Sequence, residues 1–342
     1  MKRIKQSYVM SSSAFSVPRK CIRQFRFIPE HKPQIGDLVY GEVSKLGFHT
    51  TLESTSARIH TIHERSRAVF TFGNRYATDF YEGMIPTNSI EYADMVARSG
   101  VIGKVTHQSE LISAPTQIRI LGYICDDDGK VINSRNHVLI KPKDKPKDKP
   151  RAKIILCIGS TMNSGKSFTA AACSYALSSM GKKVRAAKVT GTASLKDILL
   201  MQDSGAQHVL DFTYFGYPST YMLEMDELLA LFTRIDNKYG LNPKNYLVME
   251  FADGILQRET AMLLNNPYVK ERIHKLIFCA SDACGVSGGL RILKESYDLV
   301  PDAISGLCSS SYLAIREIKS FTDIEVLRSM KRDFKEICNL IA

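Results

Sequence analysis

The 342-residue chain lacks the patterns that mark membrane and secreted proteins. No run of about 18 apolar residues occurs, so no membrane-spanning helix is expected. The first 20 residues are basic, but they lack the apolar segment of a secretory signal. The eight cysteines are scattered and form no C-x-x-C pair, which argues against a structural zinc site and a disulfide framework. We therefore expect a protein of the reducing cytoplasm.

Acidic residues are scarce near the start of the chain, and no recognised nucleic-acid motif accompanies this imbalance. The net charge is +11, and residues 1–150 carry 23 Lys and Arg against 15 Asp and Glu. Residues 151–342 carry 23 against 20. A basic arm over residues 1–35 is predicted, either as a partly disordered, solvated segment or as a contact for nucleic acid or a protein partner.

A tandem repeat of Lys, Pro and Asp, "KPKDKPKDKPR" at residues 141–151, is predicted to be a linker because it holds no apolar residue that could join a core. Residues 36–140, before it, contain short segments rich in Val, Ile, Thr and Phe, which predict a small β-barrel or sandwich. Within this domain, residues 89–100 are predicted to form a helix with Ser89 as its cap and Gly100 as its stop. The histidines of this domain, such as His49, have no partner at metal-ligand spacing.

After the linker, over residues 152–342, apolar strand-like runs alternate with helical segments. "KIILCIG", "YLVMEFADG" and "KLIFCAS" are continuous apolar runs, as in strands that are buried on both faces. The alternation predicts an α/β domain with a mostly parallel sheet and helices on both faces. Ligands of such sheets bind outside the carboxyl ends of the strands.

The first of these strands leads into "GSTMNSGKS", residues 159–167, and then into a helix. A glycine-rich turn that ends in Gly-Lys-Ser before a helix is typical of a phosphate-binding loop, or P-loop, and here five residues separate its two glycines instead of the usual four. Lys166 can reach the terminal phosphates and Ser167 can bind Mg²⁺. The residues that we expect to contact ATP or another nucleotide are Gly159, Ser160, Thr161, Asn163, Ser164, Gly165, Lys166, Ser167 and Phe168.

The nine-residue loop resembles that of dethiobiotin synthetase and its relatives among the P-loop NTPases. The segments "AAKVTGTASLKD", "LVMEFADGIL" and "FCASDACGVSGGLRIL" resemble the family in the same order. The longer stretch that begins with the first of them, residues 186–228, also looks like the C-terminal domain of the DUF1611 group. The resemblance covers about residues 152–330. It implies that Ser167, Asp197 and Glu250 hold Mg²⁺ and that Lys166, Lys188 and Glu250 are catalytic.

Each implied role has an alternative in ordinary protein structure. Glu250 could cap the next helix, although a carboxylate that ends an apolar strand is costly to bury without a cation. Asp197 could be a first-turn acid that favours the helix dipole, and Asp253 could replace either carboxylate. Lys188 could be a strand-end lysine with its ammonium in water.

The chain also departs from the biotin enzymes. An aromatic, Tyr-rich insert spans Asp211–Glu227, and it is interpreted as a flap over the core or as the lining of a substrate pocket. Arg258 and Arg291 are candidates for anion contacts. Two functions remain: an ATP-dependent kinase or ligase that acts on an unidentified small acid or amine, or a switch ATPase of the ParA and MinD type whose basic β-domain binds nucleic acid or a protein. A homodimer is compatible with both.

Overall fold

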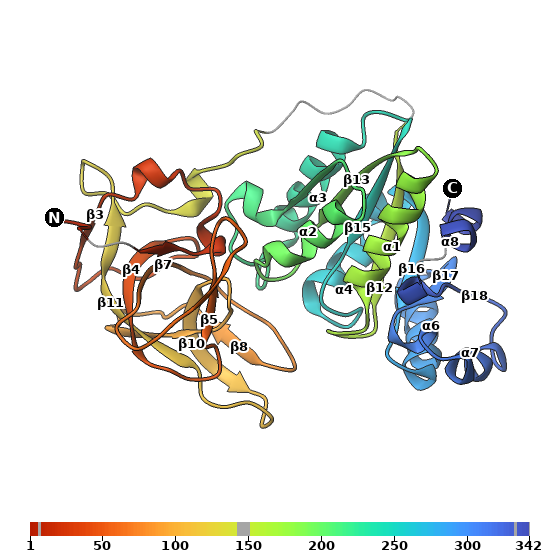
Figure 1. Ribbon diagram of the computed structural model, residues 1–342, viewed down its shortest axis with the longest axis horizontal. Coiled ribbons are helices and arrows are strands. Elements are labelled where there is room, and N and C mark those ends of the chain that lie inside the picture. Colours follow the sequence, from red (N-terminus) through yellow and green to blue (C-terminus); the bar gives the residue numbers. More distant parts are fainter. Residues whose placement is uncertain (6–7, 142–150, 332–333, 342) are drawn as a thin grey trace. The chain divides into compact units, whose positions relative to one another are not determined.

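A computed structural model describes residues 1–5, 8–141, 151–331 and 334–341. The chain forms two compact units (Figure 1), and their segments interleave along the sequence. The barrel unit comprises Met1–Lys141, Gly191–Leu195 and Phe212–Tyr221, and the α/β unit comprises the remainder. The predicted linker lies, for residues 142–150, outside the described residues. No helix in the described part of the chain is both long and apolar enough to cross a membrane.

The barrel unit is built on a closed ring of five strands. The ring runs β4–β7–β10–β9–β11 and returns from β11 to β4, with β7 and β10 parallel and the other pairs antiparallel. Buried Val39, Phe70, Met95, Ile102 and Ile118 come from all five strands and belong to one core cluster. This closure decides between the two predicted architectures in favour of a barrel. The five strands are β4 (Leu38–Lys45), β7 (Arg67–Phe72), β9 (Tyr92–Met95), β10 (Val101–Gln108) and β11 (Thr116–Cys125).

The prediction of a helix over residues 89–100 is wrong. Residues 92–95 form β9, which pairs with both β10 and β11 and so closes the ring. Ala93 and Met95 are buried whereas Tyr92 is exposed, as expected of a strand with one face on the core. Local helical spacing is outweighed here by pairing with two neighbouring strands.

The interpretation of residues 1–35 as a partly disordered arm is also wrong. Within this segment β1 (Lys2–Arg3) pairs with β3 (Gln24–Arg26), and β3 pairs with β11 of the ring. Met10, Ala14 and Val17 are buried in a second core cluster of the unit. The basic residues of this segment are therefore carried by a folded part of the barrel unit. The other short elements of the whole barrel unit are β2 (Val9–Met10), η1 (Ser12–Ala14), η2 (Arg19–Cys21), β5 (Thr51–Glu53), β6 (Ile59–Thr61), β8 (Tyr81–Met84) and η3 (Ser134–Asn136).

The α/β unit confirms the predicted parallel sheet. Its seven strands lie in the order β14–β13–β15–β12–β16–β17–β18, and every neighbouring pair is parallel. Crossovers between parallel strands are right-handed as a rule, so this strand order puts α1 and α2 on one face of the sheet and α3 and α4 on the other. The strands are β12 (Lys153–Gly159), β13 (Lys183–Lys188), β14 (His208–Asp211), β15 (Asn245–Glu250), β16 (Ile273–Cys279), β17 (Ala303–Ser305) and β18 (Glu325–Val326).

A helix follows each of the seven strands along the chain, as the predicted alternation of strands and helices requires. The strand β14, however, which ends at Asp211, the first residue of the predicted insert, was not expected. The helices are α1 (Lys166–Ser179), α2 (Leu195–Asp203), α3 (Met225–Tyr239), α4 (Arg258–Asn265), α5 (Pro267–Arg272), α6 (Ala283–Tyr297), α7 (Tyr312–Lys319) and α8 (Phe334–Ile341), with short 3-10 turns η4 (Phe212–Phe215), η5 (Leu307–Ser309) and η6 (Ser329–Lys331).

The aromatic insert divides between the units. Its first part, Phe212–Tyr221, belongs to the barrel unit, where the Tyr214 ring lies 5.0 Å from that of Phe15. The Ser134 hydroxyl donates to the carbonyl of Gly216 at 2.6 Å, and the Arg135 guanidinium lies 4.7 Å from the Tyr217 ring. The aromatic residues of this segment thus pack within the barrel unit, which neither predicted role for the insert had included.

Candidate nucleotide site

The loop between β12 and α1 has the backbone of a phosphate-binding turn. Gly165, the residue before α1, has φ +98°, and Asn163 has φ +59°. A left-handed conformation is strained for most residues but not for glycine. A side chain at Gly159 would crowd the loop, because its Cβ would lie 2.2 Å from the Ser164 hydroxyl and 2.9 Å from the Lys166 side chain. The two glycines of the motif are therefore required by the path of the loop and by close packing inside it.

Neighbouring strand ends hold this loop in place. The amides of Ser160 and Ile255 donate to the carbonyls of Cys279 (2.8 Å) and Gly159 (2.8 Å) respectively, and that of Leu307 donates to Ser164 (3.2 Å). Gly306, beside Leu307, could not carry a side chain because its Cβ would meet the Ser164 carbonyl at 2.1 Å. The sequence analysis missed Gly306 as part of the site; a glycine directly after a strand is the signal that could have found it.

Lys166 lies folded back over the loop. It is 5% exposed, and its Nζ donates to the carbonyl of Thr161 at 2.7 Å and to the Ser164 hydroxyl at 3.5 Å. Burial lowers the pKa of Lys166, and the charges of Glu250 and Asp253 partly oppose this change. A buried ammonium that is held mainly by a neutral carbonyl can exchange that partner for a phosphate oxygen.

Glu250 ends β15 beside the loop and is 1% exposed. The Ser167 hydroxyl, in the first turn of α1, donates to its Oε1 at 3.2 Å. Its Oε2 is buried and has no hydrogen-bond partner among the described residues. Burial raises the pKa of Glu250, while the ammonium of Lys188 acts in the opposite direction. An ionised carboxylate in this position is incompletely satisfied and would gain from a cation.

Lys188 lies between two carboxylates. It ends β13, directly across from Glu250 in the sheet register. Its Nζ lies 2.5 Å from Oδ2 of Asp197 and 3.9 Å from Oε1 of Glu250. Burial alone would lower the pKa of Lys188, but Asp197 and Glu250 raise it overall, so the side chain is an ammonium. The lysine therefore supplies positive charge inside the site, and the alternative of a solvated strand-end lysine is excluded because it is 7% exposed.

The structure thus brings Lys166, Ser167, Lys188, Asp197 and Glu250 to one edge of the sheet. Asp197, in the first turn of α2, contacts Lys188 rather than Ser167. Among the other predicted contacts, Ser164 is buried within the loop, and Phe168 is exposed on α1. In the described part of the chain, no group of three or more His, Cys, Asp or Glu side chains could hold a metal ion by itself.

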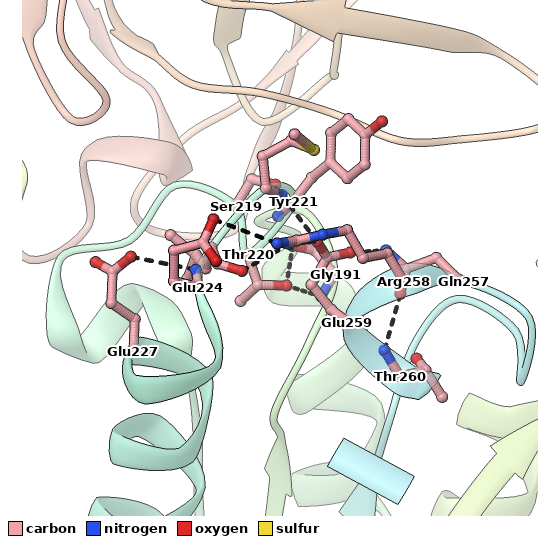
Figure 2. Close-up of polar contacts among 12 residues, drawn as sticks. Gly191, Ser219, Thr220, Tyr221, Glu224, Glu227, Gln257, Arg258, Glu259 and Thr260 are labelled. Atoms are coloured by element: carbon pink, nitrogen blue, oxygen red, sulfur yellow. Dashed lines mark hydrogen bonds and ion pairs between the residues drawn. The ribbon is translucent and has the colours of Figure 1, made fainter. Parts of the chain in front are cut away.

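The two arginines proposed for anion contacts have other environments. Arg291 is exposed on α6 and lies 3.9 Å from Glu295. Arg258 lies between two acids (Figure 2): its guanidinium is 2.8 Å from Glu259 and 3.3 Å from Glu224. It also donates to the carbonyl of Leu223 at 2.7 Å. Arg258 is therefore already engaged in holding the start of α4 to the segment before α3.

Glu259 is the buried centre of that network. It is fully buried, and its Oε1 accepts from the backbone amide of Met222 at 2.9 Å as well as from Arg258. The Gln257 side-chain amide donates to its Oε2, and the Gln257 oxygen in turn caps α4 by accepting from the amide of Thr260 at 3.1 Å. This network (Figure 2) joins the start of α4 to the residues before α3.

Comparison with known proteins yields similarity in solved structures only. No protein-family model matches the chain, and no curated protein sequence is similar to it. The signal recognition particle receptor FtsY from Elizabethkingia anophelis, in complex with GDP, is 10% identical with a TM-score of 0.36 over 57% of this chain. A ParA family ATPase from Chlorobium tepidum is 15% identical with a TM-score of 0.34, over 52% of this chain and 83% of that one.

FtsY from Mycoplasma mycoides is 13% identical with a TM-score of 0.32 over 54% of this chain. The present chain spans 61% of the length of each of these two FtsY chains. Similarity of this degree concerns the fold alone.

Proposed function

We propose that the protein is a Mg²⁺-dependent, ATP-binding P-loop enzyme that transfers a phosphoryl group to a small acid or amine, or uses ATP to ligate it. The observation that carries this proposal is the buried, unsatisfied Oε2 of Glu250 beside Ser167 and the phosphate loop. Phosphoryl transfer needs positioned cations along the phosphates more than it needs a protein nucleophile.

The residues at the site fit magnesium. Ser167 and Glu250 offer two hard oxygen ligands on one side of the loop, and Mg²⁺ usually keeps several waters, so a cluster of three protein carboxylates is not required. When bound, the ion would neutralise charge on the terminal phosphates. Asp197 is 2.5 Å from Lys188 through its Oδ2, which favours a role in holding that lysine over direct contact with the ion.

Lys166 and Lys188 would have different roles in this mechanism. Lys166 would leave the Thr161 carbonyl for the terminal phosphates, because charge-assisted hydrogen bonds are stronger than those to a neutral carbonyl. Lys188, buried and cationic, would stabilise the transferring group or the acceptor where negative charge develops. The dethiobiotin-synthetase resemblance agrees with these roles, but the polar segment after Glu250 and the aromatic insert differ from that family, and we do not assign a biotin precursor as substrate.

Kinetics of three variants test this proposal. Glu250→Gln and Lys188→Ala should bind ATP with wild-type affinity within about threefold, yet lower kcat and kcat/KM together by roughly 10²–10³, because their contacts form chiefly in the transition state. Lys182→Ala, an exposed lysine of the same unit, is the matched control and should change neither. Unchanged ATP turnover in both site variants would refute the proposed enzymatic function.

A second candidate function rests on a groove of the barrel unit. A cavity of about 500 Å³ is lined in part by Lys20, Arg23 and Lys130. Among the described residues, the structure records no hydrogen bond or ion pair of these three side chains. The carboxylates of the groove, in contrast, accept hydrogen bonds within the unit. Asp126 accepts from two amides of its own turn, and Asp127 accepts from Gln24 at 3.2 Å.

Free cations in a groove suit a phosphate backbone, whose neutralisation drives nucleic-acid binding. The neighbouring β1 and β3 add Lys2, Arg3 and Arg26, and the exposed Phe27 follows β3. An exposed aromatic ring can stack on a base. The second candidate is therefore an ATPase whose barrel unit binds single-stranded nucleic acid, and it is compatible with the first site.

A further inference from the structure

Two segments of chain that connect elements of the α/β sheet belong to the barrel unit. Gly191–Leu195 follows β13 and precedes the body of α2, and Phe212–Tyr221 follows β14. The shorter segment is notable for its place in the sequence: Lys188 lies three residues before it and Asp197 two residues after it. These are the two partners of the ion pair at the candidate site.

Within the barrel unit, the two segments are bound to each other. Thr220 and Gly191 exchange hydrogen bonds (Figure 2): the Gly191 amide donates to the Thr220 hydroxyl at 2.8 Å, and the Thr220 amide donates to the Gly191 carbonyl at 2.9 Å. The Ala193 amide donates to the Pro218 carbonyl at 3.0 Å. The path of Gly191–Leu195 is thus fixed at its start and its middle.

The end of the segment is fixed by Glu53 of β5. Glu53 is 2% exposed, and its Oε1 accepts from the Leu195 amide at 3.0 Å. The same oxygen accepts from the hydroxyl of Ser12 at 2.5 Å, and Ser12 is itself fully buried in the folded N-terminal segment. A buried carboxylate with two donors is held in one orientation, so it can define the position of the amide that it binds.

Leu195 is the first residue of α2, and the amides of a first helical turn have no acceptor inside the helix. Glu53, on a strand that is far from α2 in the sequence, supplies an acceptor for the Leu195 amide. Its negative charge also interacts favourably with the positive end of the helix dipole. Asp197 lies in the same first turn. Loss of the Glu53 acceptor would allow this turn to fray, and the Asp197 carboxylate would then leave its 2.5 Å contact with Lys188.

We infer that Glu53 is a positioning residue for the candidate nucleotide site: it anchors the first turn of α2, so that Asp197 holds Lys188 in place for phosphoryl transfer. The inference rests on the proposed function, and it gives the barrel unit a part in turnover. A misplacement of about 1 Å in a reacting group can lower a rate by about 10²-fold.

The test compares Glu53→Ala with Glu53→Gln in the full-length protein. Alanine removes the acceptor, whereas the glutamine oxygen can still accept from Leu195 and Ser12. With Mg·ATP as the substrate, Glu53→Ala should lower kcat for phosphate release by about 10- to 100-fold with KM for ATP changed less than about threefold. Glu53→Gln should stay within about threefold of wild type.

Hydrogen exchange provides a readout that needs no nucleotide. Amides of residues 195–199 should exchange at least about tenfold faster in Glu53→Ala than in wild type, with near-wild-type protection in Glu53→Gln. Glu42→Ala is the matched control, because Glu42 is a buried barrel carboxylate that pairs with Arg67 and Arg119 and not with Leu195. It should leave both readouts unchanged.

The outcomes separate this inference from the proposed function. Unchanged exchange over residues 195–199 in Glu53→Ala would overturn the inference, whether or not the protein hydrolyses ATP. Equal losses of kcat in Glu42→Ala and Glu53→Ala would also overturn it, because the effect would then report general damage to the barrel. Wild-type protein that does not bind Mg·ATP would refute the proposed function alone.

Discussion

The barrel unit and the α/β unit treat buried charge differently. In the barrel, Glu42 is neutralised by Arg67 and Arg119, and Asp37 accepts from the His31 ring and the Asn133 side chain. In the α/β unit, Lys166 and Glu250 are as deeply buried but only partly satisfied. Glu42 and Asp37 are satisfied within the barrel's own structure, whereas Lys166 and Glu250 leave positions for a ligand.

The difference follows from strand direction. In the α/β unit every neighbouring pair of strands is parallel, so all carboxyl ends lie along one edge of the sheet, and charged residues that end adjacent strands, such as Lys188 and Glu250, meet there. Most pairs of the barrel ring are antiparallel, so its strand ends alternate between two rims. A parallel sheet therefore concentrates charge at one place, which is why the candidate chemistry lies in that unit.

The largest expected effect on stability lies at a buried charge of the α/β unit that is fully paired. Asp236 of α3 has no exposed surface and contacts Arg151 at 2.9 Å and Arg272 at 2.8 Å. Asp236→Ala leaves these guanidiniums uncompensated, and removal of one partner of a buried pair typically costs about 3–5 kcal/mol. Because the chain has no tryptophan, urea unfolding is best followed by hydrogen exchange of peptides from each unit.

The control is Glu295→Ala, which removes an exposed pair with Arg291 within α6 of the same unit. Exposed pairs contribute between zero and about 1 kcal/mol, so its unfolding midpoint should barely move. Similar losses in the two variants would show that burial does not distinguish these charges.

A smaller effect is expected from pH on the barrel unit. Burial, reinforced by the charge of Arg75, lowers the pKa of His49 to about 4 from an ordinary 6.5. The unfolded chain therefore takes up a proton between pH 6.5 and 4 that the folded barrel does not, and stability falls as the pH drops through this range. The loss should be roughly 2–3 kcal/mol by pH 4.

His49→Phe isolates this contribution, since the ring lies among Phe48, Phe80 and Tyr81 and a phenyl group suits that environment. As the pH falls from 6.5 to 4, wild type should lose unfolding free energy relative to His49→Phe. Above pH 6.5 the difference between the two proteins should be constant. A difference that is constant from pH 7 to pH 4 would contradict a depressed pKa at His49.

The smallest effect concerns the groove of the barrel unit. If Lys20, Arg23 and Lys130 contact single-stranded nucleic acid, replacing all three by Glu should reduce the slope of log affinity against log salt by about 2, at roughly 0.7 per phosphate contact. Fluorescence anisotropy with a labelled oligonucleotide measures this slope. Replacing Lys45, an exposed barrel lysine outside the groove, by Glu is the control. An equal change of this slope in the control would show that binding depends on the net charge of the protein and not on the groove.

The sequence was most informative about the α/β unit, for a physical reason. Continuous apolar strands and the Gly-Lys-Ser turn are local patterns, and they predicted the sheet, α1 and the meeting of Lys166, Lys188 and Glu250 at one edge. The roles of these residues stay predictions. In the barrel, the strand β9 was mistaken for a helix because its identity depends on pairing with β10 and β11, which local spacing does not record.

Contacts between residues that are far apart in the sequence also could not be predicted from local sequence patterns. Glu53 is an ordinary acid in the sequence, and only folding brings it to the amide of Leu195. The aromatic run after β14 looked like a flap or a pocket lining, yet Phe212–Tyr221 packs in the barrel unit. Burial of an aromatic residue can be predicted from its type, but the surface that buries it cannot.

Calorimetric titration of Mg·ATP into wild-type protein and Lys166→Ala tests the central claim most directly. Lys166 is the one residue whose proposed role is to bind the terminal phosphates, and its present partner, the Thr161 carbonyl, lies within the same loop. We predict a saturable heat for wild type and for the Lys182→Ala control, and none for Lys166→Ala at the same concentrations. Equal ATP affinity in Lys166→Ala and wild type would contradict a nucleotide site at this loop.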